Sequence, residues 1–202
     1  LGSLSIGQLR EEGFEPLAII ALLSRIGTSD PIEAFGHLSE IMEQFSIQKF
    51  GRSTAKFDPD ELRIINSKTL QMLEFDKVSD RFEQFGLSEI DAEFWNVIRA
   101  NISYFQDTRF WWQLCHSELK PVIEDAEICK IALETLPQGE LTSEIWPNWD
   151  ANISAKSGKK GKSLYQPLRL ALTGRTEGPE LKYLLKYMGR ERVQKRLSGI
   201  MA

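Results

Sequence analysis

The clearest fold signal in this sequence lies in the stretch Leu164-Tyr-Gln-Pro-Leu-Arg-Leu-Ala-Leu-Thr-Gly-Arg-Thr-Glu-Gly-Pro-Glu-Leu-Lys-Tyr-Leu-Leu-Lys-Tyr-Met-Gly-Arg-Glu-Arg-Val-Gln-Lys-Arg-Leu197. Its apolar residues recur at steps of three and four, the spacing that lines one face of a helix. Glycines interrupt the pattern at Gly174 and Gly189, and glycine is common where helices end. The stretch therefore predicts three consecutive helices over 164–172, 179–188 and 190–200.

The same periodicity extends through the rest of the chain, and no run alternates with the period of two that marks a strand. We therefore expect an all-α protein built from consecutive small helical bundles, with the last two forming a helical array. Breaks near 73–75 and 137–139 predict three units, 1–74, 75–137 and 138–202. A flexible segment is expected over 154–163. The remaining predicted helices cover 14–26, 32–45, 59–73, 75–85, 90–102, 110–119, 121–136 and 142–153.

Length and composition exclude several classes of protein. The 202 residues are 42% apolar, which is enough to bury a core and argues against wholesale disorder. No apolar run approaches the roughly 20 residues that span a bilayer, and the N-terminus lacks the pattern of a signal peptide. Two cysteines cannot build a disulfide framework. We expect a reduced, cytoplasmic protein without membrane contact, and the absence of an initial methionine suggests a fragment.

Charge is distributed unevenly along the chain. From residue 154 onward, 12 lysines and arginines face three glutamates, so this segment carries +9, whereas the preceding residues carry −13. Each cation that neutralises a phosphate releases counterions and adds affinity for nucleic acid. A solvated basic pair of helices that balances the acidic part is the other explanation of the same pattern.

Motifs for catalysis and metal binding fail on spacing. The segment Gly158-Lys-Lys-Gly-Lys-Ser163 places two residues between its glycines, whereas a phosphate-binding P-loop requires four. Cys115, His116 and Cys129 lie on predicted helices without the further ligands of a metal site. We expect no catalytic residue and no metal site in this chain, and the cysteines are expected to be buried.

An aromatic cluster leaves two interpretations open. Its rings can pack in the core, or they can form a surface on which unpaired bases stack. Trp111 and Trp112 are adjacent, so both cannot face inward on one helix. A helical adaptor that binds another protein through Trp111 or Trp112 is the alternative function that we consider. The cluster consists of Trp95, Phe105, Phe110, Trp111 and Trp112.

Three stretches together resemble the C-terminal half of bacterial glutamyl-tRNA synthetases. The first begins Leu1-Gly-Ser-Leu-Ser-Ile and continues through Leu9-Arg-Glu-Glu-Gly-Phe-Glu-Pro-Leu-Ala18. The second is Lys56-Phe-Asp-Pro-Asp-Glu-Leu-Arg-Ile-Ile-Asn66, in which Glu61 stands where the family often has lysine. The third and most specific is Pro167-Leu-Arg-Leu-Ala-Leu-Thr-Gly-Arg175 with the Gly-Pro and Gly-Arg-Glu segments that follow it.

The resemblance implies a fold and a function. The family's H-I-G-H and K-M-S-K-S motifs, which belong to its ATP-binding catalytic domain, do not occur here, so the resemblance implies a fragment that is inactive alone. It implies a stem-contact domain over 1–74 and anticodon-binding subdomains over 75–137 and 138–202. The parent enzyme would attach glutamate to tRNA(Glu) with ATP and Mg²⁺. The implied partner is tRNA(Glu), with tRNA(Gln) left open, and we expect a monomer.

Candidate RNA contacts follow from the charge pattern and the resemblance together. Arginine's planar fork suits a base edge or a phosphate, and lysines on a glycine-containing loop suit the sugar-phosphate backbone. Arg175 is our first choice for an anticodon contact, whereas Arg169 could instead pair with a carboxylate. The candidate set is Arg175, Arg169, Thr173, Gly174, Arg99, Asn101, Lys156, Lys159, Lys160 and Lys162.

Overall fold

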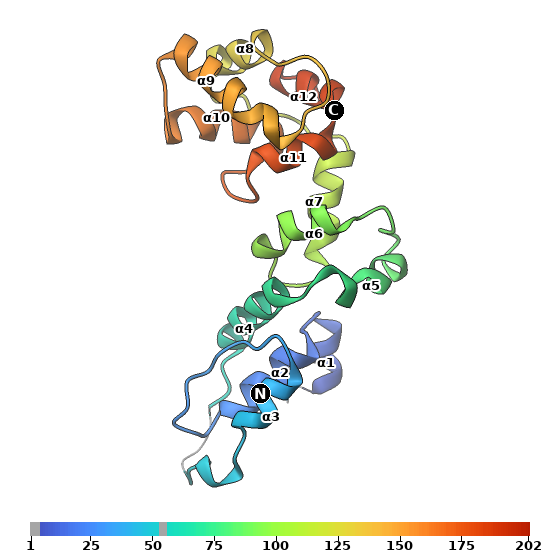
Figure 1. Ribbon diagram of the computed structural model, residues 1–202, viewed down its shortest axis with the longest axis vertical. Coiled ribbons are helices and arrows are strands. Elements are labelled where there is room, and N and C mark those ends of the chain that lie inside the picture. The colour runs from blue at the N-terminus through green and yellow to red at the C-terminus, as the bar shows by residue number, and fades with distance from the viewer. Residues whose placement is uncertain (1–4, 53–55) are drawn as a thin grey trace. The chain divides into compact units, whose positions relative to one another are not determined.

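A computed structural model describes residues 5–52 and 56–202, and this part of the chain is helical without a strand (Figure 1). The start of the first family-like stretch, residues 1–4, lies outside the described residues. The all-α prediction is confirmed. The helices are α1 (Ile6–Glu11), α2 (Pro16–Arg25), α3 (Leu38–Gln44), α4 (Pro59–Met72), α5 (Ser79–Gln84), α6 (Ala92–Ile98), α7 (Asp107–His116), α8 (Ala126–Glu134), α9 (Trp146–Ser157), α10 (Lys162–Thr173), α11 (Leu181–Met188) and α12 (Arg190–Leu197).

Short 3₁₀ turns connect several of these helices. They are η1 (Ile47–Lys49), η2 (Phe75–Lys77), η3 (Arg99–Asn101) and η4 (Ser143–Ile145). No helix within the described ranges is long and apolar enough to cross a membrane.

The contacts divide the chain into two compact units, residues 1–109 and residues 110–202. We call these unit 1 and unit 2 and describe each by itself. The three-part division at residues 74 and 137 stays a prediction.

Unit 1 is built around the packing of α2 on α4. The Asp58 carboxylate accepts a hydrogen bond from the Asp60 amide at 2.9 Å, and Pro59 occupies the first turn of α4, as the sequence predicted. Such a cap satisfies one of the amide groups that a helix start leaves without a partner. The buried side chains of this core are Leu9, Phe14, Ala18, Ile19, Ala21, Leu22, Phe35, Ile41, Leu62 and Ile65.

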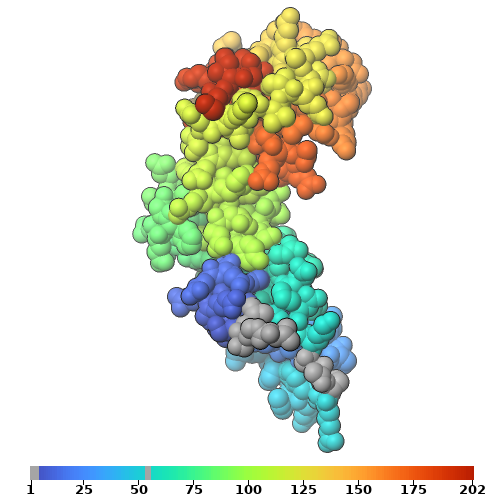
Figure 2. Space-filling view, turned by 180° about the vertical axis from the view of Figure 1, so that it is seen from behind, coloured from blue at the N-terminus to red at the C-terminus, as the bar shows by residue number. Residues whose placement is uncertain are grey.

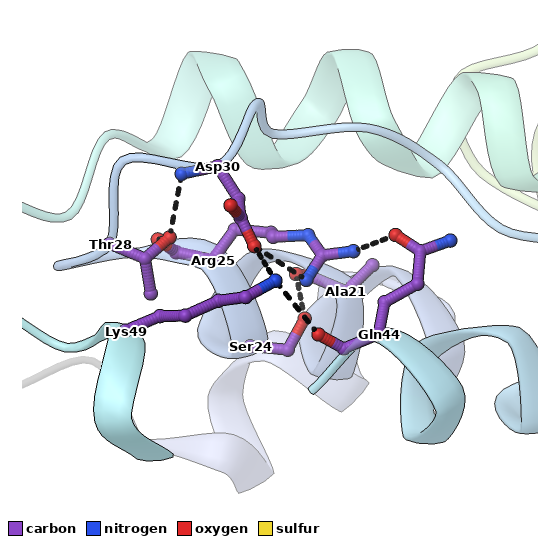
Figure 3. Close-up of polar contacts among 7 residues, drawn as sticks. All are labelled: Ala21, Ser24, Arg25, Thr28, Asp30, Gln44 and Lys49. Atoms are coloured by element: carbon purple, nitrogen blue, oxygen red, sulfur yellow. Dashed lines mark hydrogen bonds and ion pairs between the residues drawn. The ribbon is translucent and has the colours of Figure 1, made fainter. Parts of the chain in front are cut away.

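A polar cluster follows the end of α2 (Figure 3). The buried Arg25 guanidinium lies 3.5 Å from the Asp30 carboxylate and also donates to the Gln44 side chain. The Lys49 ammonium lies 2.8 Å from the same Asp30 oxygen and holds the pKa of that carboxyl below its usual value. The cluster therefore connects the end of α2 with the following loop, with the end of α3 and with η1.

Two predicted helices of unit 1 begin later than the apolar pattern suggested. The helix expected over 32–45 starts at Leu38, because the chain reaches His37 in an extended conformation. Phe35 is nevertheless buried, with Ile32 and Ala34 packed against the core. An extended segment can therefore bury apolar side chains whose spacing suits a helix. Similarly, the helix expected over 75–85 separates into η2 and α5.

Unit 2 gathers α8, α9, α10, α11 and α12 around a buried arginine. The Arg196 side chain donates to the backbone carbonyls of Leu172 at 2.7 Å, Ser117 at 2.9 Å and Ala202 at 2.8 Å. Residue 202 also exchanges two backbone hydrogen bonds with Leu119. In Figure 2 the red C-terminal residues accordingly lie against the yellow-green segment that follows α7.

The segment expected to be flexible, 154–163, is mostly helical, so that prediction is wrong. α9 continues to Ser157 and α10 begins at Lys162, which leaves four residues between them. Gly158, with a φ of 68°, ends α9 in the left-handed conformation that glycine adopts without strain. The buried Ile153 and Leu164 anchor the two helices, so lysine content alone gave a misleading signal.

Two further boundaries differ for local reasons. The helix expected over 121–136 begins at Ala126, because the Asp125 carboxylate caps it by accepting from the Ile128 amide at 3.1 Å. The helix expected over 142–153 begins at Trp146, and η4 occupies the preceding residues. By contrast, α10, α11 and α12 lie within two or three residues of their predicted bounds.

Candidate nucleic-acid interface

Arg169 lies at a hollow of about 300 Å³ in unit 2. Three helices build this hollow: α9 supplies its first residue, α10 supplies two residues one turn apart, and the start of α11 supplies the rest. A helix repeats its face every three or four residues, which explains why Tyr165 and Arg169 both reach the hollow. Its lining residues are Trp146, Tyr165, Arg169, Glu180, Leu181 and Lys182.

One wall of the hollow is aromatic. The rings of Trp146 and Tyr165 have centroids 6.3 Å apart with 32° between their planes. The Tyr165 hydroxyl donates to the Asp150 carboxylate at 3.0 Å, which fixes the orientation of the ring. Trp149, buried beneath Trp146, donates its indole N–H to the Ala132 carbonyl at 3.0 Å. The wall is thus held in place from behind, yet Tyr165 remains 38% exposed and available to a ligand.

The polar side of the hollow holds one unsatisfied donor. The Arg169 Nη1 atom is buried and has no hydrogen-bond partner among the described residues. Burial lowers the pKa of Arg169, and the nearby Glu180 charge opposes that shift. Leaving a buried donor unpaired costs about 1–3 kcal/mol, so an acceptor brought by a ligand would recover this energy. The sequence left open that Arg169 pairs with a carboxylate, but the carboxylate of the nearby Glu180 lies 2.7 Å from Lys182.

Thr173 and Gly174 end α10 and do not line the hollow. The buried Thr173 hydroxyl donates to the Arg169 carbonyl at 2.7 Å and accepts from the Arg175 amide at 3.2 Å. Gly174 has a φ of 65° and donates its amide to the Leu170 carbonyl. Both residues thus satisfy backbone groups at the helix end, which is a structural role.

Arg175, the first choice from the sequence, lies on the surface beside an aromatic ring. Its guanidinium carbon is 4.5 Å from the centroid of Phe110, a cation–π arrangement. Arg175 does not line the hollow. An RNA contact by Arg175 therefore stays a prediction. Arg169 is the stronger candidate, because its buried Nη1 atom lacks a partner beside a hollow.

The four lysines of the candidate set differ in whether a carboxylate lies beside them. Lys159 forms an ion pair with Asp125, which raises the pKa of Lys159. Lys156 lies 3.9 Å from Glu134. Lys160 and Lys162 are exposed. The last two suit a phosphate contact best, because the others already have carboxylate partners.

Arg99 and Asn101 belong to η3 in unit 1, whereas the other eight candidates belong to unit 2. The Arg99 guanidinium donates to the Leu73 carbonyl at 3.0 Å and lies 3.3 Å from Glu74. The first bond ties η3 to the end of α4.

The structure also shows how far the two cysteines and the two adjacent tryptophans are buried. Cys115 and Cys129 are buried, as expected, and burial raises their pKa values to about 12 and about 11. Trp111 is buried against Gly178, while Trp112 is half-buried and stacks on His116 with ring centroids 3.9 Å apart. Within the described ranges, no group of three or more histidines, cysteines or carboxylates could hold a metal ion.

Sequence reasoning found Arg169 but missed the other residues of the hollow, Trp146, Tyr165, Glu180, Leu181 and Lys182. The four-residue step from Tyr165 to Arg169 on a predicted helix was a usable signal. Trp146 comes from another helix, and no local pattern could have connected it to the same site.

Comparison with known proteins supports a role in RNA binding. Residues 119–201 match a family described as "Anticodon binding domain". The chain is 41% identical over 199 residues to glutamate–tRNA ligase 1 of Maricaulis maris, covering 98% of this chain and 44% of that protein. It is 39% identical over 202 residues to glutamate–tRNA ligase 2 of Beijerinckia indica, covering 100% of this chain and 45% of that protein. The chain thus spans less than half the length of these relatives.

Solved structures agree with the fold. A glutamate tRNA ligase from Elizabethkingia meningosepticum, in complex with its amino acid, superposes with a TM-score of 0.74 at 19% identity. That similarity covers 94% of this chain and 41% of the other. A glutamate-tRNA synthetase from Elizabethkingia anophelis gives a TM-score of 0.73 with the same coverage. At this level of identity, the agreement concerns the helical fold alone.

Proposed function

We propose, from the premise that this chain belongs to the glutamate–tRNA ligases as the C-terminal part that lacks their catalytic domain, that unit 2 binds the anticodon loop of tRNA(Glu). The observation that carries the proposal is the unpaired, buried Nη1 of Arg169 beside the aromatic wall of the hollow. The basic segment from residue 154 onward adds attraction for the phosphate backbone.

The chemistry of the hollow suits one unstacked nucleobase. Bases in RNA loops are splayed out, and proteins stack them on aromatic rings and bind their Watson–Crick edges. A base stacked against Trp146 or Tyr165 would offer an acceptor to Arg169 and an amino group to the Glu180 carboxylate. Cytosine carries a ring nitrogen next to an exocyclic amine and matches this pair. Uracil has a carbonyl in the place of that amine. Its oxygen would face the Glu180 carboxylate, and two acceptors cannot form a hydrogen bond with each other.

The experiment is a binding titration of a labelled anticodon stem-loop of tRNA(Glu) with the 202-residue chain. Arg169→Gln should weaken binding about tenfold, because a charge-assisted hydrogen bond to the base, worth about 1.5–3 kcal/mol, is lost. Lys130→Gln is the matched control, since Lys130 is an exposed cation of unit 2 outside both the hollow and the candidate set. Equal binding by wild type and Arg169→Gln would contradict the proposal.

The activity of the whole protein follows as a further part of this proposal. The relatives are glutamate–tRNA ligases, so the full protein would attach glutamate to tRNA(Glu) with ATP. Binding of the anticodon stem-loop of tRNA(Gln) to the same chain would show whether this half distinguishes the two tRNAs. We also propose that the protein acts as a monomer in the cytoplasm, which sedimentation and cell fractionation can test.

The alternative function, a protein-binding adaptor, is not favoured. Trp111 is 6% exposed and packs against Gly178, so it cannot act as a surface anchor. Trp112 is half-buried and stacks on His116, and the hollow lined by His116 also holds charged side chains of both signs.

A further inference from the structure

One side of α3 exposes apolar side chains to solvent. Leu38, Met42 and Phe45 follow one another at steps of four and three residues, so they lie on the same side of the helix. Ile47 comes two residues later, in η1. These four side chains are between 47% and 72% exposed. We call them the α3 apolar face.

The exposure of these side chains is unusual for a surface helix, which normally turns polar residues toward the solvent. Ile41 is the residue of α3 that is buried in the core of unit 1. The α3 apolar face is therefore additional to the side chains that the core already uses. Single exposed apolar side chains are ordinary, but a group of them marks an interaction surface.

The polar cluster of Figure 3 holds this part of the chain in place. The Arg25 guanidinium donates to the Gln44 side chain at the end of α3. The Lys49 ammonium donates to the Gln44 carbonyl at 3.2 Å and to the Asp30 carboxylate at 2.8 Å. These bonds fix the end of α3 and η1 to the end of α2. A surface that is fixed beforehand loses little conformational entropy when a partner binds.

Charge makes a nucleic acid a poor partner for this face. α3 contains two glutamates, Glu40 and Glu43, and no lysine or arginine. The first lysine after it, Lys49, is paired with Asp30. Residues 1–109 together carry 11 lysines and arginines against 18 aspartates and glutamates. Phosphates bind where cations are in excess, so the face suits a protein surface that has apolar side chains of its own.

The relatives indicate which protein surface is absent. This chain spans less than half the length of the glutamate–tRNA ligases that it matches, and it is their C-terminal part without the catalytic domain. More than half of each relative therefore precedes the matched region. Unit 1 is the unit that follows this preceding part along the chain. A domain that is covalently joined to unit 1 meets it at high effective concentration.

We propose that the α3 apolar face packs against the catalytic domain that precedes unit 1 in the complete ligase, the full-length protein whose C-terminal part this chain represents. Apolar side chains of that domain cover Met42 and Ile47, the two most exposed members of the face. The inference goes beyond anticodon binding. It rests on membership of the family and not on the RNA contact of unit 2, so either proposal can fail without the other.

The test compares the solvent access of this face in the complete ligase and in the 202-residue chain. Met42→Cys places a thiol on the face. Glu43→Cys, the matched control, places one about 100° further round the same helix. Each protein is treated with a maleimide at pH 7, and the labelling of the peptide that contains the new cysteine is followed by mass spectrometry.

Met42→Cys should react about tenfold more slowly in the complete ligase than in the 202-residue chain, because the contact must open before the thiol can react. Glu43→Cys should react at similar rates in both proteins. Ile47→Cys is a second reporter on the face and should show the same protection as Met42→Cys. The replaced side chains are exposed, so each variant of the 202-residue chain should melt within about 3 °C of wild type.

Equal labelling of Met42→Cys and of Ile47→Cys in the two proteins would overturn the proposal. Two other occupants would give results of their own. Labelling of the 202-residue chain that slows as its concentration rises would show that a second copy covers the face. Labelling that slows when tRNA(Glu) is added would show that RNA covers it. Either result would also overturn the proposal, and the stem-loop titration with Arg169→Gln would be unaffected.

Discussion

At the scale of single residues, the buried Arg196 and the half-buried Arg169 differ in how many of their donors are bonded. Arg196 donates to three backbone carbonyls, whereas Arg169 keeps one buried nitrogen without a partner among the described residues. Burial lowers the pKa of Arg196 to about 10, which still leaves it charged near neutral pH. A fully bonded buried arginine stabilises a fold, and an incompletely bonded one beside a hollow suits a ligand.

We predict that Arg196→Met lowers the free energy of unfolding of unit 2 by about 3–5 kcal/mol, because it leaves the buried Leu172 carbonyl without its donor and removes the bonds to Ser117 and Ala202. Urea denaturation followed by circular dichroism measures this change. Arg175→Met is the control, since its exposed side chain loses only a ring contact. Similar stability of the two variants would contradict the structural role of Arg196.

The thiols give a second prediction at this scale. Because burial raises the pKa of Cys115 to about 12 and that of Cys129 to about 11, almost no thiolate forms at pH 8. Both cysteines should therefore react with Ellman's reagent only after denaturant is added. Rapid reaction of two thiols in the native chain would show that the helices open around them.

At the scale of elements, helix ends depend on caps that the apolar pattern does not reveal. Asp125 sets the start of α8, and Gly158 and Gly174 set the ends of α9 and α10. The sequence predicted the strongly periodic helices α10, α11 and α12 well, since their apolar positions face one core. It misplaced the start of α3, because Phe35 is buried from an extended segment.

The Asp125–Lys159 pair leads to a pH prediction. The Lys159 hydrogen bond lowers the pKa of Asp125 in the folded state, so this pair stabilises the fold above the carboxyl's unfolded pKa of about 4. Its contribution disappears as the pH falls through the lowered value. The raised pKa of Lys159 likewise means that the contribution is lost in strong alkali, as the pH rises through the folded value.

Thermal melting of wild type and Lys159→Met at different pH values tests the contribution of the Asp125–Lys159 pair. The difference in melting temperature should be present at pH 7 and shrink toward zero at the lowest pH at which the chain stays folded. Lys160→Met is the control, because Lys160 is exposed and forms none of the ion pairs recorded for its neighbour. A difference that persists unchanged in acid would indicate a packing effect of Lys159 instead.

At the scale of the whole molecule, the sequence and the structure agree on the all-α fold class. Family-like stretches led to the anticodon-binding interpretation, and Arg169 was among the candidates. The remaining residues of the hollow come from α9, α10 and α11 and meet only through tertiary packing. This is why residues such as Trp146 and Glu180 could not be assigned from local sequence patterns.

The missing catalytic part gives a prediction for the chain as a whole. The matched region is the C-terminal part of the relatives and lacks their catalytic domain. The purified 202-residue chain should therefore show no glutamate-dependent ATP–pyrophosphate exchange, although it binds the stem-loop. Exchange that persists after repeated purification would show that this chain contains catalytic groups of its own.

The most direct test of base recognition by Arg169 combines a base change with a side-chain change. Affinities are measured for wild type and Arg169→Gln with stem-loops in which each anticodon cytosine is replaced in turn by uracil. If Arg169 recognises a cytosine, one replacement weakens binding to wild type about tenfold or more and has little effect on binding to Arg169→Gln. Equal losses in both proteins at every position, or no loss in either, would contradict base recognition by Arg169.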